Sequence, residues 1–298
     1  MSLASAGKFP ESAHLFKFCH RVLTQKRGKR VNDQDVGSIL NFNPSDCSHW
    51  KRGKKNVRSV FALEKLATEL NIEVALIYDI ISGAVDIDEA YYEHQQAIEF
   101  RRVLAAARQE DPGLLNDVQQ RCEQFISELH QRCEYVVPPL YLPEVMLFFP
   151  SISTQAVDMV DKLSRILRVK SSQYCIQFRS GDIRPQTRMS VIAELARILL
   201  QGERSKYPQL GELNEALLKF EQHLFIAEML APKAMLKREM QNVDARKNLI
   251  SGLAAQFWVP RMLISYQMQS ILRSHLAEAV LSQGDQQQPA SFSEGARV

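Results

Sequence analysis

The stretch from Val36 to Lys55, VGSILNFNPSDCSHWKRGKK, combines residue types that could bind a nucleic acid. Short polar side chains stand where an amphipathic helix would turn outward, and a group of cations follows at once. Short polar groups can reach base edges in the major groove, whereas lysine and arginine contact the flanking phosphates. The polar positions are Asn43, Ser45, Asp46, Ser48 and His49, and the cations are Lys51, Arg52, Lys54, Lys55 and Arg58. The pattern predicts a DNA-binding surface made of these residues.

The distribution of charge supports a polyanionic partner. Residues 1–60 hold 12 Lys and Arg against 4 Asp and Glu, so they carry +8, and the rest of the chain carries −5. The overall charge of +3 conceals this asymmetry. A basic segment of this size attracts nucleic acid at long range.

Helices must position these side chains, and the sequence predicts five short ones between residues 10 and 83. They are expected over 13–25, from Asn32 or Asp33 to Leu40, from Asn43 with Pro44 in its first turn, over 57–70, and over 74–81 with Gly83 as the stop. Apolar Val36, Ile39, Leu40, Cys47 and Trp50 are spaced to bury one common face, and small Gly37 falls where two helices cross closely. Residues 1–83 are therefore predicted to form an all-helical domain.

This domain resembles the helix-turn-helix of the XRE family, the phage-repressor-like regulators, whose pattern runs L-A-x-x-L-G-[VI]-S-x-x-x-I-S-x-W-E-x-G. Val36-Gly37 take the L-A places, Leu40-Asn41 the L-G, Cys47-Ser48 the I-S, and Trp50 and Gly53 the W and the final Gly. The resemblance covers about 70 residues and implies binding to double-stranded DNA by a homodimer. An alternative is a helix-turn-helix that docks another protein instead of DNA.

Departures from the pattern concern base recognition. Lys51 replaces the usual Glu, Pro44 stands where many relatives have a long base-reading side chain, and Asp33 replaces Gln. The base specificity of the family therefore does not transfer, and Ser45, Asp46 and His49 are the positions to test.

A second stretch with chemical interest is RMSVIAELARILLQG, residues 188–202, which is predicted to be helical. In a His-Glu-x-x-His helix, the two histidines bind zinc and the Glu activates the metal-bound water. Here Ala193 and Arg197 occupy the histidine positions, and Glu194 keeps the place of the general base. Alanine offers no lone pair and a guanidinium is permanently charged, so the pattern indicates a helix without its metal.

With its flanks, this helix is similar to the zinc helix of ImmA/IrrE-type metallopeptidases. Arg188, Glu194, Leu195, Leu199 and Leu200 match, and residues 220–236 and 253–272 resemble two later family stretches in the right order. The resemblance covers roughly residues 135–275 and implies an α+β zincin-like domain that has lost its catalytic chemistry. The vestigial cleft would contain Arg188, Ala193, Glu194, Arg197, Glu221 and His223.

Several readings of this cleft stay open. Glu194 would pair with Arg197 or another nearby cation. Arg184, Arg188 and Arg197 would suit an anionic ligand, such as a small anionic metabolite, and a protein effector is an alternative. In an enzyme reading, Glu194, Glu221 and His223 would hold a metal in a rearranged site and cleave a partner repressor.

The remaining sequence completes a mainly α architecture. A helical connector or dimerisation region is expected over 84–134, with helices over 87–107 and 114–133, followed by the zincin-like domain over 135–281 and a disordered tail over 282–298. Within 135–281 we expect one or two strands in 135–152, a helix over 155–168, a strand over 173–179, and helices over 211–230, 233–256 and 260–281. Phe257 and Trp258 are expected in the core first and in a pocket second.

The sequence as a whole predicts a bacterial transcription regulator with a catalytically inactive, peptidase-like sensor domain. No apolar run reaches the roughly 18 residues of a membrane span, and no secretory core precedes the first domain, so a cytoplasmic, nucleoid-associated protein is expected. The five cysteines include no C-x-x-C pair, which favours reduced thiols and no cysteine-based zinc site. We expect no cofactor and no metal. A regulator that binds DNA constitutively, with the second domain only dimerising, is a further alternative.

Overall fold

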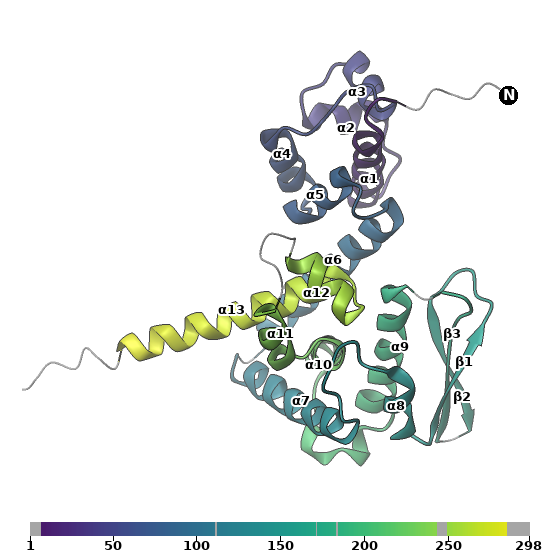
Figure 1. Cartoon of the computed structure of the whole chain (residues 1–298), viewed down its shortest axis with the longest axis vertical. Helices are drawn as coiled ribbons and strands as arrows, with labels where there is room; N and C mark the ends of the chain where they lie inside the picture. The colour runs from purple at the N-terminus through teal and green to yellow at the C-terminus, as the bar shows by residue number, and fades with distance from the viewer. Residues whose placement is uncertain (1–6, 111, 171, 183, 243–248, 285–298) are drawn as a thin grey trace, which may run out of the picture. The chain divides into compact units, whose positions relative to one another are not determined.

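The computed structural model describes residues 7–110, 112–170, 172–182, 184–242 and 249–284, with side chains described through Leu272 except at residue 112 (Figure 1). The protein is mainly helical, with a small three-stranded mixed sheet. It divides into two compact units, unit 1 (Met1–Arg101) and unit 2 (Arg102–Val298). None of the helices in the described part of the chain has the length and apolar composition to cross a membrane.

Unit 1 contains the five predicted short helices. They are α1 (Pro10–Arg27), α2 (Asp33–Ile39), α3 (Pro44–Lys51), α4 (Val60–Leu70) and α5 (Val74–Ser82), and the first part of α6 (Ile87–Arg108) follows. Asn32 caps α2 with a reciprocal capping box, Asn43 caps α3, and Gly83 ends α5 in the left-handed conformation. These signals are local in the sequence, which is why the helices of unit 1 could be predicted.

Trp50 is the centre of the unit 1 core. Its side chain is fully buried, packs edge-on against Phe16 with ring centroids 5.0 Å apart, and donates from Nε1 to the carbonyl of Ser12 at 2.8 Å. The Ser12 hydroxyl in turn accepts from the backbone N–H of Val57 at 3.0 Å. Because Trp50 lies on α3 and Ser12 on α1, these contacts fix the orientation of α3.

In unit 2, a three-stranded sheet is covered on one face by a helix. The sheet has the order β1-β3-β2, with β1 (Ile152–Val157) parallel to β3 (Gln173–Arg179) and β2 (Ser164–Lys170) antiparallel to β3. Helix α9 (Pro185–Arg197) packs on the sheet, and α10 (Glu215–Leu230) packs on α9 (Figure 1). The hydroxyls of Ser164 and Ser190, 2.5 Å apart, join β2 to α9.

Two predictions for the start of unit 2 are wrong. Residues 155–168, expected to be helical, contain the second half of β1, a connecting loop and most of β2, because both strands pair with β3. Residues 135–152, expected to hold strands, contain α8 (Leu142–Leu147), and only Ile152 enters a strand. The prolines of this segment cannot donate to a β-ladder. The strand predicted at 173–179 is confirmed, with the same bounds.

The helices expected as a connector, α6 and α7 (Pro112–Arg132), have nearly the predicted bounds, and α7 packs along α10. After α9 come a π-helical turn (Ile198–Gly202), two 3-10 turns (Arg204–Lys206 and Pro208–Leu210), α10, α11 (Lys233–Met240), α12 (Leu249–Phe257) and α13 (Arg261–Gly284). The single helix expected over 233–256 is therefore two helices, and residues 243–248 lie outside the described residues. Of the predicted tail 282–298, the first three residues belong to α13, and 285–298 lie outside the described residues.

Candidate functional site

Helices α2 and α3 of unit 1 cross as closely as the sequence predicts. A Cβ added to Gly37 would lie 2.9 Å from Sγ of Cys47 and 3.0 Å from its Cβ, closer than side chains approach. The Cys47 thiol donates to the carbonyl of Asp33 at 2.8 Å, which fixes the crossing further. Asn41 and Gly53 have left-handed backbone conformations, with φ of 57° and 66°. Glycine is favoured in that conformation, and both residues match glycines of the XRE pattern.

The polar residues of α3 divide into those that hold the helix and those that face outward. The Asn43 side chain accepts from the backbone N–H of Asp46 at 2.8 Å and so caps α3. Asp46 accepts from Nζ of Lys55 at 2.7 Å. Ser45 and His49 are exposed and lie one turn apart on the same face, while Ser48 is half-buried. The outward face of α3 therefore presents Ser45 and His49.

The cations predicted to bind DNA also differ in their contacts within the protein. Lys51 forms an ion pair with Asp33 at 2.6 Å, and Lys55 lies 4.1 Å from the Phe42 ring in addition to its pair with Asp46. Arg58 donates to the carbonyl of Ile81 at 3.2 Å and lies 3.6 Å from Glu11. Arg52 and Lys54 are exposed, and neither forms an ion pair with a residue that the structure describes. The two cations without an ion pair in the described chain, Arg52 and Lys54, thus follow directly after α3.

In unit 2, the residues at the zinc-motif positions of α9 do not form a metal site. Nη1 of Arg197 lies 3.1 Å from Oε2 of Glu194, which confirms the predicted pair. The Arg197 side chain is largely exposed, whereas Glu194 is buried. Oε2 of Glu194 accepts no hydrogen bond from a residue that the structure describes. Ala193 is half-buried and provides no donor atom.

Glu221, expected in the same cleft, pairs with an arginine. Its carboxylate is 1% exposed and pairs with the guanidinium of Arg204, at 2.5 Å to Nη1 and 3.3 Å to Nη2. Burial raises the pKa of Glu221, and Arg204 opposes that rise. In the described part of the chain, no group of three or more His, Cys, Asp or Glu residues, with or without His223, could hold a metal ion. The donor set at these positions does not fit zinc.

Arg188, expected at a ligand site, joins three segments of unit 2. Its Nη1 donates to the carbonyls of Phe257 and Trp258 at 2.9 and 3.1 Å, and its Nη2 donates to the carbonyl of Leu140. Burial lowers the pKa of Arg188 to about 10. Since both terminal nitrogens donate to main-chain carbonyls, this arginine holds the end of α12 and the segment before α8 against α9.

A cavity of about 320 Å³, the α9 pocket, lies beside the first half of α9. Its walls are mostly apolar and comprise Pro139, Leu140, Tyr141, Leu142, Pro143, Met146, Thr154, Phe178, Asp182, Arg184, Thr187, Arg188, Val191 and Trp258. Trp258, expected in the core first and in a pocket second, lines this pocket and is 40% exposed, because α12 ends at Phe257 and Trp258 itself turns left-handed, with φ of 53°. Pro260, two residues later, is a sequence signal for this helix end, which was expected at residue 256.

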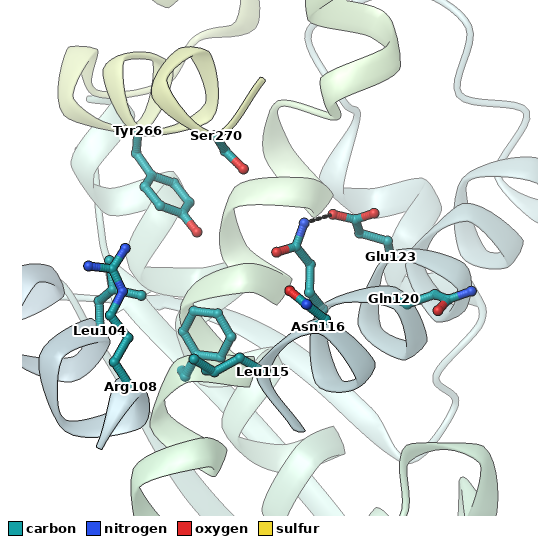
Figure 2. A pocket seen from close by; sticks show the side chains of 10 residues that line it. Leu104, Arg108, Leu115, Asn116, Gln120, Glu123, Tyr266 and Ser270 are labelled. Carbon is teal, nitrogen blue, oxygen red and sulfur yellow. Dashed lines mark hydrogen bonds between the residues drawn. The ribbon is translucent and has the colours of Figure 1, made fainter. Parts of the chain in front are cut away.

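A second cavity, of about 450 Å³, lies among the end of α6, α7, α10 and α13 (Figure 2). Polar side chains dominate it, including Asn116, Gln120, Tyr266 and Ser270. Nε2 of Gln119 donates to Oε1 of Glu123 at 2.8 Å, the bond drawn in Figure 2, and Nζ of Lys233 approaches the same oxygen at 2.5 Å. The sequence patterns singled out none of these residues, because the side chains that line the cavity come from four separate helices, α6, α7, α10 and α13.

The chain was also compared with known proteins. No protein-family model, no curated protein and no solved structure matches it. What the protein does is therefore inferred from the helix-turn-helix geometry of unit 1 and from the surroundings of α9 in unit 2.

Proposed function

We propose that the protein is a sequence-specific DNA-binding transcription regulator of the XRE type, with a peptidase-like second domain that has no metal centre. The observation that carries the proposal is the close crossing of α2 and α3 at Gly37 and Cys47, which leaves Ser45 and His49 on the outward face of α3. Arg52 and Lys54 follow that face without ion-pair partners in the described chain. Such a helix can enter the major groove while adjacent cations contact phosphates.

The contacts within unit 1 give these residues different roles in the proposal. Asn43 and Asp46 maintain the start of α3, so Ser45 and His49 are the residues proposed to reach base edges. Arg52 and Lys54 contribute most of the phosphate attraction, and Lys51 and Lys55 contribute by exchanging a surface carboxylate for a phosphate. A homodimer would place two α3 helices about 34 Å apart, one turn of DNA.

For unit 2, the proposal of a degenerate zincin-like domain rests on the order of its elements. Strand β3 leads through the turn at Gly181 into α9, which packs on the sheet and carries Glu194 on a buried face. The replacement of both histidine positions by Ala193 and Arg197, and the engagement of Glu221 by Arg204, support a non-enzymatic role.

The salt dependence of DNA binding tests the regulator proposal. Genomic fragments recovered with the purified full chain would supply the operator, and log affinity would then be measured against log salt. We expect Arg52→Ala and Lys54→Ala each to lower the slope by about 1, because each removes one phosphate contact. Lys65→Ala is the matched control, since Lys65 is an exposed cation on α4, and its slope should not change. Unchanged slopes for both variants would overturn DNA binding and favour a protein-docking helix-turn-helix.

Metal analysis tests the second half of the proposal. We expect the purified chain to contain far less than one zinc ion per molecule and a chelator to leave DNA binding unchanged. One zinc per chain, together with chelator-sensitive cleavage of a partner repressor, would contradict the proposal and favour the peptidase reading.

A further inference from the structure

The α9 pocket has an apolar interior and a single polar edge. The segment before α8, Met146 of α8, Phe178 of β3 and Val191 of α9 supply the apolar wall. Asp182, Arg184 and Thr187, at the start of α9, make the polar edge. A concave, mostly apolar cavity with a few convergent polar groups is the usual form of a small-molecule site.

The charged groups around the pocket already have partners in the protein. Arg184 binds Asp182 through two bonds, from Nε at 2.9 Å and Nη2 at 2.7 Å, and this pairing holds the pKa of Asp182 well below its usual range. Arg188 donates from both terminal nitrogens to main-chain carbonyls. A charged ligand would have to disrupt one of these arrangements and would also lose its own hydration. The pocket therefore disfavours an ion as ligand.

Trp258 is the second feature that points to a ligand. An aromatic residue seldom adopts a positive φ, and strained backbone of this kind gathers at binding sites. Here the strain is maintained by Arg188, which binds the Trp258 carbonyl and whose guanidinium carbon lies 5.8 Å from the centre of the indole ring. The indole thereby stays partly exposed at the pocket instead of entering the core.

We infer that the α9 pocket binds a neutral, mostly apolar small molecule that bears one hydrogen-bonding group, placed at the edge formed by Asp182 and Thr187. An apolar cavity of about 150 Å³ admits benzene, so a pocket of 320 Å³ suits a molecule about twice that size. The cavity of Figure 2 has a larger polar share, since seven of its ten lining side chains are polar or charged. The inference names the class of effector for the proposed regulator, and in that respect it rests on the proposed function.

Titration calorimetry of the full chain, without DNA, tests the inference with three probes of equal chain length: octan-1-ol, octanoate and octylammonium. We expect octan-1-ol to bind at least tenfold more tightly than either ion and to shift the fluorescence of Trp258. A Trp258→Phe variant should lose that shift, since the other tryptophan, Trp50, is fully buried in unit 1.

A matched pair of variants on β1 ties the binding to this pocket. Thr154 lines the pocket and Ser153 does not; both are exposed, and neighbouring residues of a strand point to opposite faces. Thr154→Phe should weaken octan-1-ol binding at least tenfold, whereas Ser153→Phe should leave it unchanged. Tighter binding of octanoate or octylammonium, equal binding by the two variants, or no binding of octan-1-ol would each overturn the inference.

Operator binding, measured with and without octan-1-ol, separates this inference from the regulator proposal. A changed operator affinity supports the effector role, and pocket binding with an unchanged affinity would overturn that role. Unchanged salt slopes of DNA binding in Arg52→Ala and Lys54→Ala would instead overturn the regulator proposal, whatever the pocket binds.

Discussion

Unit 1 and unit 2 place their charged side chains in different surroundings. In unit 1, the pairs Lys51–Asp33 and Lys55–Asp46 lie at the surface, with about a third to half of each side chain exposed. In unit 2, Glu221 and its partner Arg204 are 1% and 15% exposed. Surface pairs contribute about 0–1 kcal/mol and exchange readily, whereas removing one partner of a buried pair costs about 3–5 kcal/mol. Lys51 and Lys55 of unit 1 are thus available to a partner, while Glu221 and Arg204 of unit 2 stabilise the fold.

The largest loss of stability is expected when the buried ion pair of unit 2 is broken. Arg204→Met leaves Glu221 buried without a cation and removes donors to the carbonyls of Leu200, Leu210 and Gly211. We expect a loss of roughly 3–5 kcal/mol in the free energy of unfolding of unit 2, measured by hydrogen exchange of α9 and α10 under native conditions.

Two further variants isolate the cause. Arg197→Met, which breaks the more exposed pair with Glu194, should cost under about 1 kcal/mol. The double variant Arg204→Met with Glu221→Leu should recover part of the loss, since it leaves no buried charge. An equal effect of Arg204→Met and Arg197→Met would contradict the distinction between the two pairs.

Both units are expected to lose stability at low pH, because each contains a buried histidine. Burial lowers the pKa of His94 in unit 1 and of His130 in unit 2 to about 4, although Nε2 of His130 also donates to the carbonyl of Met229 at 3.1 Å. Below pH 6.5 the unfolded chain binds protons that the folded chain does not bind until about pH 4. The free energy of unfolding should therefore fall as the pH drops through this range, by at most about 3 kcal/mol for each histidine.

Denaturant titrations between pH 4 and pH 7 measure this loss. His130→Gln should flatten the pH dependence of unit 2 and leave that of unit 1, while exchange of the exposed His14 for Gln serves as the control. A pH dependence of unit 2 that survives in His130→Gln would assign it to other groups.

A smaller effect is expected where α2 and α3 cross. Gly37→Ala places a methyl group within 3.0 Å of Cys47 and must separate the two helices. We expect unit 1 to lose about 1–3 kcal/mol and operator affinity to fall, because the orientation of α3 changes. Ser38→Ala, at the exposed neighbouring position, should change neither quantity. Unchanged denaturation midpoint and affinity in Gly37→Ala would show that the crossing is looser than the structure indicates.

The smallest effect concerns the surface pairs of unit 1. Asp33→Asn and Asp46→Asn release Lys51 and Lys55, so we expect under about 1 kcal/mol of lost stability and a salt slope of DNA binding that steepens by up to about 1 for each change. Asp88→Asn releases Arg21 from a comparable surface pair on α6 and should leave the slope unchanged. A gain in slope from Asp88→Asn as large as from the other two would mean that general charge, and not the position beside α3, drives binding.

Much of unit 1 could be predicted because its signals are local. Asn32 and Asn43 each cap the helix that follows, Pro44 opens α3, and Gly83 ends α5, all within a few residues of the helix ends that they determine. The role of Gly37 also followed from spacing alone, and the contact with Cys47 confirms it.

Predictions for unit 2 failed where structure depends on distant pairing. Residues 155–168 were expected to be helical, yet they contribute to β1 and β2 because β3 offers hydrogen bonds on both of its edges. The α9 pocket is a comparable case, since its walls come from segments as far apart as Pro139 and Trp258.

The sequence by itself determined the helices of unit 1, the concentration of positive charge after Trp50, and the presence of Ala193 and Arg197 where a His-Glu-x-x-His helix would carry histidines, because residue type and local spacing are enough for each. Only the tertiary structure decided which of these charges remain unengaged and that Glu221 pairs with Arg204. It also decided that Arg188 donates to the carbonyls of Phe257 and Trp258. Burial and ion pairing bring together side chains that lie far apart along the chain, and no local sequence pattern predicts those contacts.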